Sequence, residues 1–335
     1  GNFSRPAGGP ADSATYNLAD FLFGNRSSYA LVNFFIAQYR QRLQFGYLQD
    51  DFKVSARLTL NLGVRYEYAA PQWEEENQLS NYDPGANKMI LAKGGSLYDR
   101  ALVNPDRNNF APRVGFAYSG RYGVVVRGGY GIAHTHFNRA GGGNLLALNG
   151  PQVVNGSVSQ ITSEATFRTT QQGYPVGFTS PDRFDPLLAS VKYLTRGQPA
   201  GYVQSWFFSL QREIAKSTLL DVAYVGNRGL KLPMFGDYNQ ARPNGPTEDT
   251  PLQQRRPIRG FANIGVGFPG GWSNYHGLQA RFERRAGGGL FLLQSFTWSK
   301  ALDNVAQALE TPNGNSSNPQ NIRDLRPEKG PAAYD

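Results

Sequence analysis

The sequence predicts an all-β fold, a partial transmembrane antiparallel β-barrel with short periplasmic turns and long extracellular loops. Three features of the sequence support this prediction. One stretch alternates between apolar and polar residues for longer than an ordinary strand does. Short turn sequences recur between stretches of the same kind, and long connections rich in Pro and Gly separate the resulting hairpins.

The longest alternating stretch covers residues 57–68, with the sequence RLTLNLGVRYEY. Apolar or aromatic residues occupy every second position, which gives a strand one apolar and one polar face. At roughly 3.3 Å per residue the strand is roughly 40 Å long, and at a tilt of about 45° it rises roughly 28 Å, close to the height of an outer-membrane apolar band. Because ordinary globular strands have about 5 to 6 residues, a soluble sandwich fits the alternation but not the length.

The composition also favours a β-rich membrane protein. Mean hydropathy is −0.47 although only 18% of residues are charged, so most of the polarity comes from Gly, Pro, Asn, Gln, Ser and Thr. Aromatic residues make up 13% of the chain, as aromatic girdles require. No run of about 18 apolar residues occurs, which excludes a transmembrane helix and leaves a barrel as the membrane-spanning alternative.

Charge and cysteine content exclude several other functions. The net charge is +9, but the arginines are spread along the chain without a basic block, so we expect no nucleic-acid partner. The absence of Cys excludes a disulfide framework and thiolate metal sites. The first residues, GNFSRP, lack the charged and apolar segments of a secretory signal, which we expect upstream of them.

Four tight hairpins are predicted, with turns of about three or four residues that contain Gly, Ser or Lys. Their strands are expected at residues 44–53 and 57–68, 110–118 and 122–133, 202–214 and 218–227, and 274–285 and 290–300. In the second hairpin we expect Tyr122 on the same strand face as Val124 and Val126, with Arg127 on the other.

Long connections separate these hairpins, at residues 69–109, 135–201 and 228–273. Compact soluble domains rarely contain unstructured loops longer than about 12 to 15 residues. Short turns at one end and long loops at the other are typical of outer-membrane barrels. A fourth such loop without a strand is expected after Lys300, and residues 17–24 are expected to form a strand end or a helical turn.

Candidate catalytic and ligand-binding residues are few. His134 and His136 share a strand face, but no Cys or acidic residue lies within ten positions of either, so interfacial histidines are favoured over a metal site, and His276 is alone. Residues 128–131 and 141–143 are glycine-rich but not placed between a strand and a helix. Two groups of adjacent acidic residues occur. Residues 50–51 are expected near the periplasmic interface, and residues 74–76 in a solvated loop. We therefore expect no enzyme activity, catalytic residue, metal or cofactor.

Six charged residues lie inside the predicted strands. On a barrel we expect them to face the lumen, because the lipid face penalises charge. Two roles remain open for them: they line a substrate path, or they provide lumen polarity that packs against a plug or water. The six residues are Arg65, Glu67, Arg113, Arg127, Arg281 and Glu283.

Several strand sequences resemble one known family. Residues 45–53 and 57–68 are similar to the hairpin QDDWKVTPRLTLNLGLRYEY of TonB-dependent outer-membrane receptors of the Oar-like type. Other segments resemble successive strands of the same barrels and occur in the same order. These segments are residues 109–116, 126–131, 222–229, 274–279 and 297–303.

The resemblance implies a transporter in the outer membrane of a Gram-negative cell. It implies uptake of a large or scarce nutrient, with outer-membrane lipid and the TonB complex as partners, the latter through upstream segments. Such barrels have about 22 strands around a plugged lumen, so we expect residues 1–335 to be an internal fragment of one barrel domain. Its clear strands are expected at about residues 44–303, and we expect the signal peptide, plug domain and closing strands to lie outside residues 1–335. A passive porin and a surface β-rich adhesion protein are the alternatives.

Overall fold

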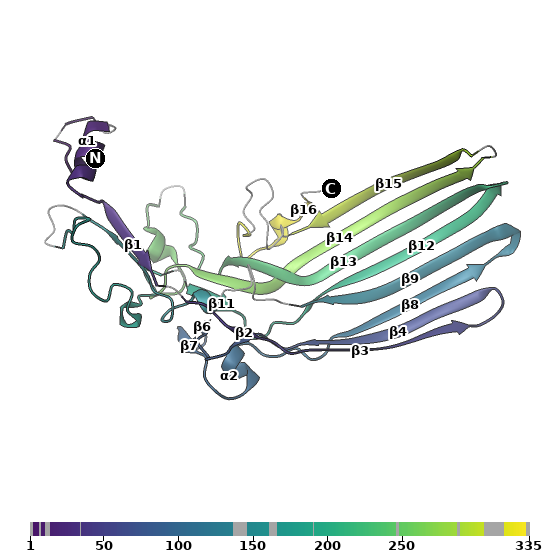
Figure 1. Cartoon of the computed structure of the whole chain (residues 1–335), viewed down its shortest axis with the longest axis horizontal. Coiled ribbons are helices and arrows are strands. Elements are labelled where there is room, and N and C mark those ends of the chain that lie inside the picture. Colours follow the sequence, from purple (N-terminus) through teal and green to yellow (C-terminus); the bar gives the residue numbers. More distant parts are fainter. Residues whose placement is uncertain are drawn as a thin grey trace.

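Eight long strands lying side by side dominate the fold, and their turns are gathered at one end (Figure 1). The computed structural model describes residues 3–6, 8–10, 14–33, 35–136, 146–160, 166–189, 191–245, 248–286, 289–304 and 318–332. Along the sheet the order is β16-β15-β14-β13-β12-β9-β8-β4-β3, and β11 pairs with β14 outside this path. The predicted antiparallel β fold is confirmed.

The eight long strands form four consecutive hairpins. Their bounds are β3 (Leu43–Lys53), β4 (Leu58–Ala69), β8 (Phe110–Ser119), β9 (Val124–Thr135), β12 (Gly201–Ala215), β13 (Thr218–Asp237), β14 (Ile264–Arg285) and β15 (Phe291–Asp303). The alternating stretch at residues 57–68 becomes β4, which pairs with β3 on one side and β8 on the other.

The turns between paired strands are short, as expected. The turn from β8 to β9 differs in one detail, because Tyr122 was expected in the strand but lies in the turn. Its φ of 58° belongs to the left-handed region, which an extended strand cannot contain. Ser217 closes the turn from β12 to β13 with the same φ of 58°.

Two of the long loops are shorter than predicted, the one between β13 and β14 and the one after β15. β13 continues to Asp237 and β14 begins at Ile264, so the connection expected at residues 228–273 is reduced to residues 238–263. The register between these strands shifts after Gly229, where Lys231 has a φ of 54°, and such a bulge interrupts the alternation that reveals a strand. After Lys300, β15 runs to Asp303 and pairs with the short strand β16 (Gly330–Pro331), where no strand was expected.

The long connections contain regular structure of their own. Residues 17–24, left open between strand and helix, fall largely within α1 (Ala14–Leu22). Elsewhere β1 (Ser28–Val32) pairs with β10 (Asn155–Ser159), β2 (Tyr39–Arg40) with β5 (Trp73–Glu74), and β6 (Ser80–Asp83) with β7 (Lys88–Leu91). The strand β11 (Val191–Leu194) pairs in parallel with the start of β14, and α2 covers Leu97–Ala101. In the described residues, no helix has the length and hydropathy to cross a membrane.

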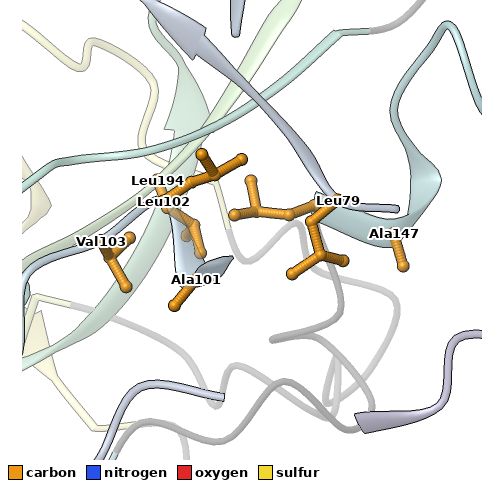
Figure 2. Packing of buried hydrophobic residues seen from close by; sticks show 7 residues of the cluster. Leu79, Ala101, Leu102, Val103, Ala147 and Leu194 are labelled. Carbon is orange, nitrogen blue, oxygen red and sulfur yellow. The ribbon is translucent and has the colours of Figure 1, made fainter. Parts of the chain in front are cut away.

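The buried core lies among these connections rather than between the long strands. One cluster joins Leu79, the α2 end, the turn at Leu146–Leu148 and Leu194 of β11 (Figure 2). A second cluster joins Tyr82 of β6, β11, Phe261 and the start of β14. We call the elements α2, β5, β6, β7 and β11, with the residues packed around them, the loop assembly. It fixes connections that the sequence suggested were unstructured.

Buried asparagines hold the loop assembly together. The Asn81 side chain donates to Leu194 O (2.9 Å) and accepts from Leu194 N (3.0 Å), as a neighbouring strand would. Asn149 bonds in the same way to both backbone groups of Lys192, at 2.8 Å and 2.6 Å. Because buried backbone groups need partners, these side chains replace the strand pairing that the irregular segments lack.

Candidate functional site on the polar face of the sheet

The long strands present two chemically different faces. Residues directly opposite each other on paired strands share a face, and Gly63 pairs with Arg113, Ala117 with Arg127, and Asp221 with Arg281. Following this register across the sheet, the six charged residues singled out in the sequence all lie on one face, which we call the polar face. They are Arg65, Glu67, Arg113, Arg127, Arg281 and Glu283.

The opposite face, here called the apolar face, has no such charges along its centre. A single row of paired residues crosses seven strands on this face, and it contains only apolar or aromatic side chains and one glycine. The row consists of Leu60, Phe116, Gly128, Phe208, Tyr224, Leu278 and Trp298. The six side chains of this row therefore form an apolar band across the sheet.

Glu67 is the centre of one charged cluster on the polar face. It is only 5% exposed, and its two oxygens bind Arg65 Nε at 2.9 Å and His136 Nε2 at 3.0 Å. The Arg65 guanidinium also lies 5.4 Å from the centre of the Phe45 ring. A buried carboxylate needs such partners, so this cluster ties the end of β9 to β4.

Glu283 is the centre of a second cluster, near the turn from β14 to β15. It is 8% exposed and binds Arg281 Nη2 at 2.7 Å and Arg285 Nη2 at 3.0 Å. The three residues alternate along β14 and therefore point to the same side. Arg281 and Glu283 therefore form an ion pair within β14.

Arg113 and Arg127 differ from the other charged residues. Neither forms an ion pair with any residue that the structure describes. Between them β8 and β9 present Gly115, Gly129 and Gly131 toward the same face. Two unpaired guanidinium groups therefore flank a strip of sheet that carries no side chains.

An open groove of about 740 Å³ lies over this strip. Besides the arginines and glycines, its lining includes Gln49, Asn61, Phe207, Asn227 and Tyr275. The Phe207 ring covers Gly129 so closely that a Cβ there would lie 2.7 Å from its Cε1 atom. Glycine is therefore required at position 129 for the ring to lie flat against the groove floor. The groove offers cations, amides and aromatic surface to a polar ligand.

The histidines do not assemble a metal site within the described residues. The rings of His134 and His136 are 6.5 Å apart, and no group of three His, Cys, Asp or Glu residues suited to a metal ion occurs there. His276 was expected to be alone, but its Nδ1 lies 2.6 Å from the Tyr224 hydroxyl.

The adjacent acidic residues take separate structural roles. Asp51 accepts a hydrogen bond from Asn61 Nδ2 at 2.6 Å on the polar face, and its neighbour Asp50 points to the other face. Glu74 was expected in a solvated loop, but it is 2% exposed and accepts from the backbone N–H groups of Glu76 and Gln78. This expectation was wrong because its carboxylate organises a turn. The glycines at 141–143 lie outside the described residues.

Sequence reasoning missed contacts between residues far apart in the chain. His136 and Glu67 are separated by 69 positions, and Tyr224 and His276 by 52. Alternation indicates which face a side chain occupies, but it says nothing about which strands are neighbours across a long connection. No local signal in the sequence identifies either contact.

Comparison with known proteins decides the class of this sheet. A family model described as outer membrane beta barrel domain matches residues 1–335. The chain belongs to this family. It is therefore an outer-membrane protein, and the predicted location is confirmed. This outer membrane barrel domain is also similar to the outer membrane transporter YddB from Escherichia coli, with 13% identity and a TM-score of 0.38 over 80% of this chain and 34% of that chain. It thus spans about a third of that structure's length. No curated protein matches the sequence.

Proposed function

We propose that the chain is part of the wall of a TonB-dependent outer-membrane transporter of the Oar-like type, which takes up a large or scarce nutrient not yet identified. The assignment is supported by the resemblance of several strand sequences to such receptors, at residues 45–53, 57–68, 109–116, 126–131, 222–229, 274–279 and 297–303. The proposed partners are outer-membrane lipid and, through segments outside this chain, the TonB complex.

The observation that carries the proposal is the contrast between the two faces. An Arg on the lipid face near the bilayer midplane costs roughly 2 to 4 kcal/mol, so the face with Arg113 and Arg127 belongs in the lumen. The groove between them then lies along the path of a substrate. Arg65 and Arg281 form ion pairs with neighbouring carboxylates of the same strand. Arg113 and Arg127 have no such partner among the described residues, which favours a role for them along a substrate path.

The proposed orientation places the four short turns in the periplasm and the loop assembly outside the cell. A folded loop assembly at the entrance presents a fixed surface to a ligand before it reaches the groove. We propose no catalytic role for the chain.

Bilayer conductance and TonB binding distinguish the proposed transporter from a passive porin. The full-length protein, reconstituted in planar bilayers, should show no steady open conductance if a plug fills its lumen as in TonB-dependent receptors. It should also bind the purified periplasmic domain of TonB. Steady conductance without TonB binding would assign the protein to the porins instead.

A further inference from the structure

We propose that the open edge of β10 binds an extended, carboxylate-bearing peptide, which adds to the pair of β1 and β10 as a third strand. This pair lies beyond the loop ends of the long strands (Figure 1). The proposal deepens the proposed function, because it names the class of substrate. It rests on that function only in placing this edge outside the cell.

The hydrogen bonds between β1 and β10 define which backbone groups of β10 face its partner. Next to the two strands, Asn33 N donates to Val154 O at 3.2 Å, and Gln160 N donates to Ser27 O at 2.8 Å. In an antiparallel pair, residues that bond to the partner strand alternate with residues whose backbone groups point away from it. Val154 and Gln160 are both bonding positions, and the register between them is unbroken. The odd-numbered residues of β10 therefore point away from β1.

These odd-numbered residues give β10 an open edge. They are Asn155, Ser157 and Ser159, and all three are exposed. β10 pairs with β1 alone among the strands that the structure describes, and the outward N–H and C=O groups make no hydrogen bond with any described residue. A row of unpaired backbone groups of this kind is a template for an added strand.

A pocket of about 330 Å³ borders the same edge. Its lining includes all five consecutive residues 154–158, and none of its described lining residues belongs to β1. Because successive side chains of a strand point to opposite faces, a pocket over one face is lined by every second residue. Lining by consecutive residues instead places the pocket along the backbone edge, on the side away from β1.

The rest of the pocket supplies apolar side chains on a fixed wall. Phe178, Phe184 and Leu188 all line it, and Leu188 is 73% exposed. The wall is tied to the second core cluster by a hydrogen bond from Ala262 N to Pro186 O at 3.0 Å. In strand addition the main-chain hydrogen bonds provide affinity and such pockets select alternate side chains of the peptide. The partner is therefore an extended peptide with apolar side chains.

The charge at the pocket identifies a further group on the peptide. Arg183 lines the pocket, is exposed, and forms no ion pair with any described residue. Asp185 also lines the pocket, but its Oδ1 accepts a hydrogen bond from Leu187 N at 2.8 Å. A carboxylate of the peptide, from its terminus or a side chain, is the complementary group for Arg183.

The test measures peptide binding to the full-length protein in detergent by fluorescence anisotropy. The probe is a labelled pentapeptide of alternating Thr and Leu with a free carboxyl terminus, and its matched control carries a methyl group on each backbone nitrogen. Methylation keeps the side chains but removes the N–H donors. Binding should weaken about 25-fold, at about fivefold for each of two bonds, to Asn155 O and Ser157 O.

Two proline variants test the edge from the side of the protein. Ser157→Pro removes an outward N–H and places a ring against the incoming strand, so it should weaken binding of the unmethylated peptide about tenfold. Val32→Pro is the matched control, because Val32 lies opposite Asn155 and its N–H points to the far edge of β1. It should leave binding unchanged. Arg183→Gln should weaken binding about threefold, as loss of an exposed ion pair does.

Equal binding of the methylated and unmethylated peptides would overturn the proposal, and so would an equal effect of Ser157→Pro and Val32→Pro. Unchanged binding by Arg183→Gln would overturn the choice of a carboxylate. A dimer that Ser157→Pro converts to a monomer would assign the edge to a second copy of this chain. Binding in detergent requires neither TonB nor transport, so these results leave the proposed transporter standing. Heat-modifiable gel mobility of each variant establishes that the barrel has assembled before its binding is compared.

Discussion

At the scale of single residues, Asn239 shows how the loop assembly depends on side-chain amides. It is fully buried, and its Nδ2 lies within 3.0 Å of the carbonyl oxygens of Ile258, Phe261 and Ala262, while its Oδ1 accepts from Ile258 N. One side chain therefore defines the path of the connection between β13 and β14.

Replacing Asn239 with Ala should loosen this connection. Each buried backbone group left without a partner costs about 1 to 3 kcal/mol, so Asn239→Ala should expose residues 238–263 to external protease on intact cells. Asn108→Ala is the control, because Asn108 is exposed and its side chain bonds to no described residue. Equal cleavage of both variants would show that Asn239 does not hold the connection.

Tyr82 gives the loop assembly a dependence on high pH. Burial, followed by the charges of Tyr238, Tyr193 and Asp83, raises the pKa of Tyr82 to about 12 from 10.0. Because the folded pKa is the higher one, the stabilisation is complete below pH 10 and is lost as the pH rises toward 12.

A titration of tyrosinate absorbance checks this value. The wild-type protein should contain a phenol that ionises near pH 12, and Tyr82→Phe should lack that step. Tyr122 lies in an exposed turn, so Tyr122→Phe should leave the step in place and serves as the control. A late step that survives Tyr82→Phe would assign it to another tyrosine.

At the scale of elements, β4 allows a direct comparison of the two faces. Leu60 belongs to the apolar band, and its neighbour Asn61 lies on the polar face beside Asp51. Leu60→Arg should reduce barrel stability by roughly 2 to 4 kcal/mol if it meets lipid. Asn61→Arg should be nearly silent, because Asp51 offers the new cation a carboxylate. Heat-modifiable gel mobility measures both.

Leu60→Trp separates lipid from a protein core. Overpacking a protein core costs roughly 1 to 3 kcal/mol, whereas lipid has no fixed packing to disturb. Leu60→Trp should therefore assemble normally. Damage equal to that of Leu60→Arg would mean that this face packs against protein.

Strands set by local alternation could be predicted from the sequence, whereas strands set by tertiary contacts could not. β4 was predictable because its alternation is local and unbroken. The end of β13 was not, because the bulge near Lys231 interrupts the alternation, and β6 and β11 were missed because they are four residues long and depend on tertiary contacts. The alternation of each strand placed Arg113 and Arg127 on the same face. The contact of Glu67 with His136 could not be predicted, because it depends on how the chain between them folds back.

At the scale of the whole molecule, the sheet has two open edges where backbone N–H and C=O groups are unpaired. Among the residues that the structure describes, β3 pairs only with β4, and β15 pairs beyond β14 only through the two residues of β16. Unpaired strand edges join to other chains, so a polypeptide of residues 1–335 alone should form oligomers or aggregates without detergent. Light scattering coupled to size exclusion measures this, and a monodisperse, cooperatively melting monomer without detergent would contradict it.

The length of β14 has a structural consequence. Its 22 residues run without interruption from the turn at one end of the sheet into the loop assembly, where β11 is bonded to it in parallel. One continuous strand therefore anchors the loop assembly directly to the long strands. The bulge beside Lys231 in the neighbouring β13 increases the local twist of the sheet between the two.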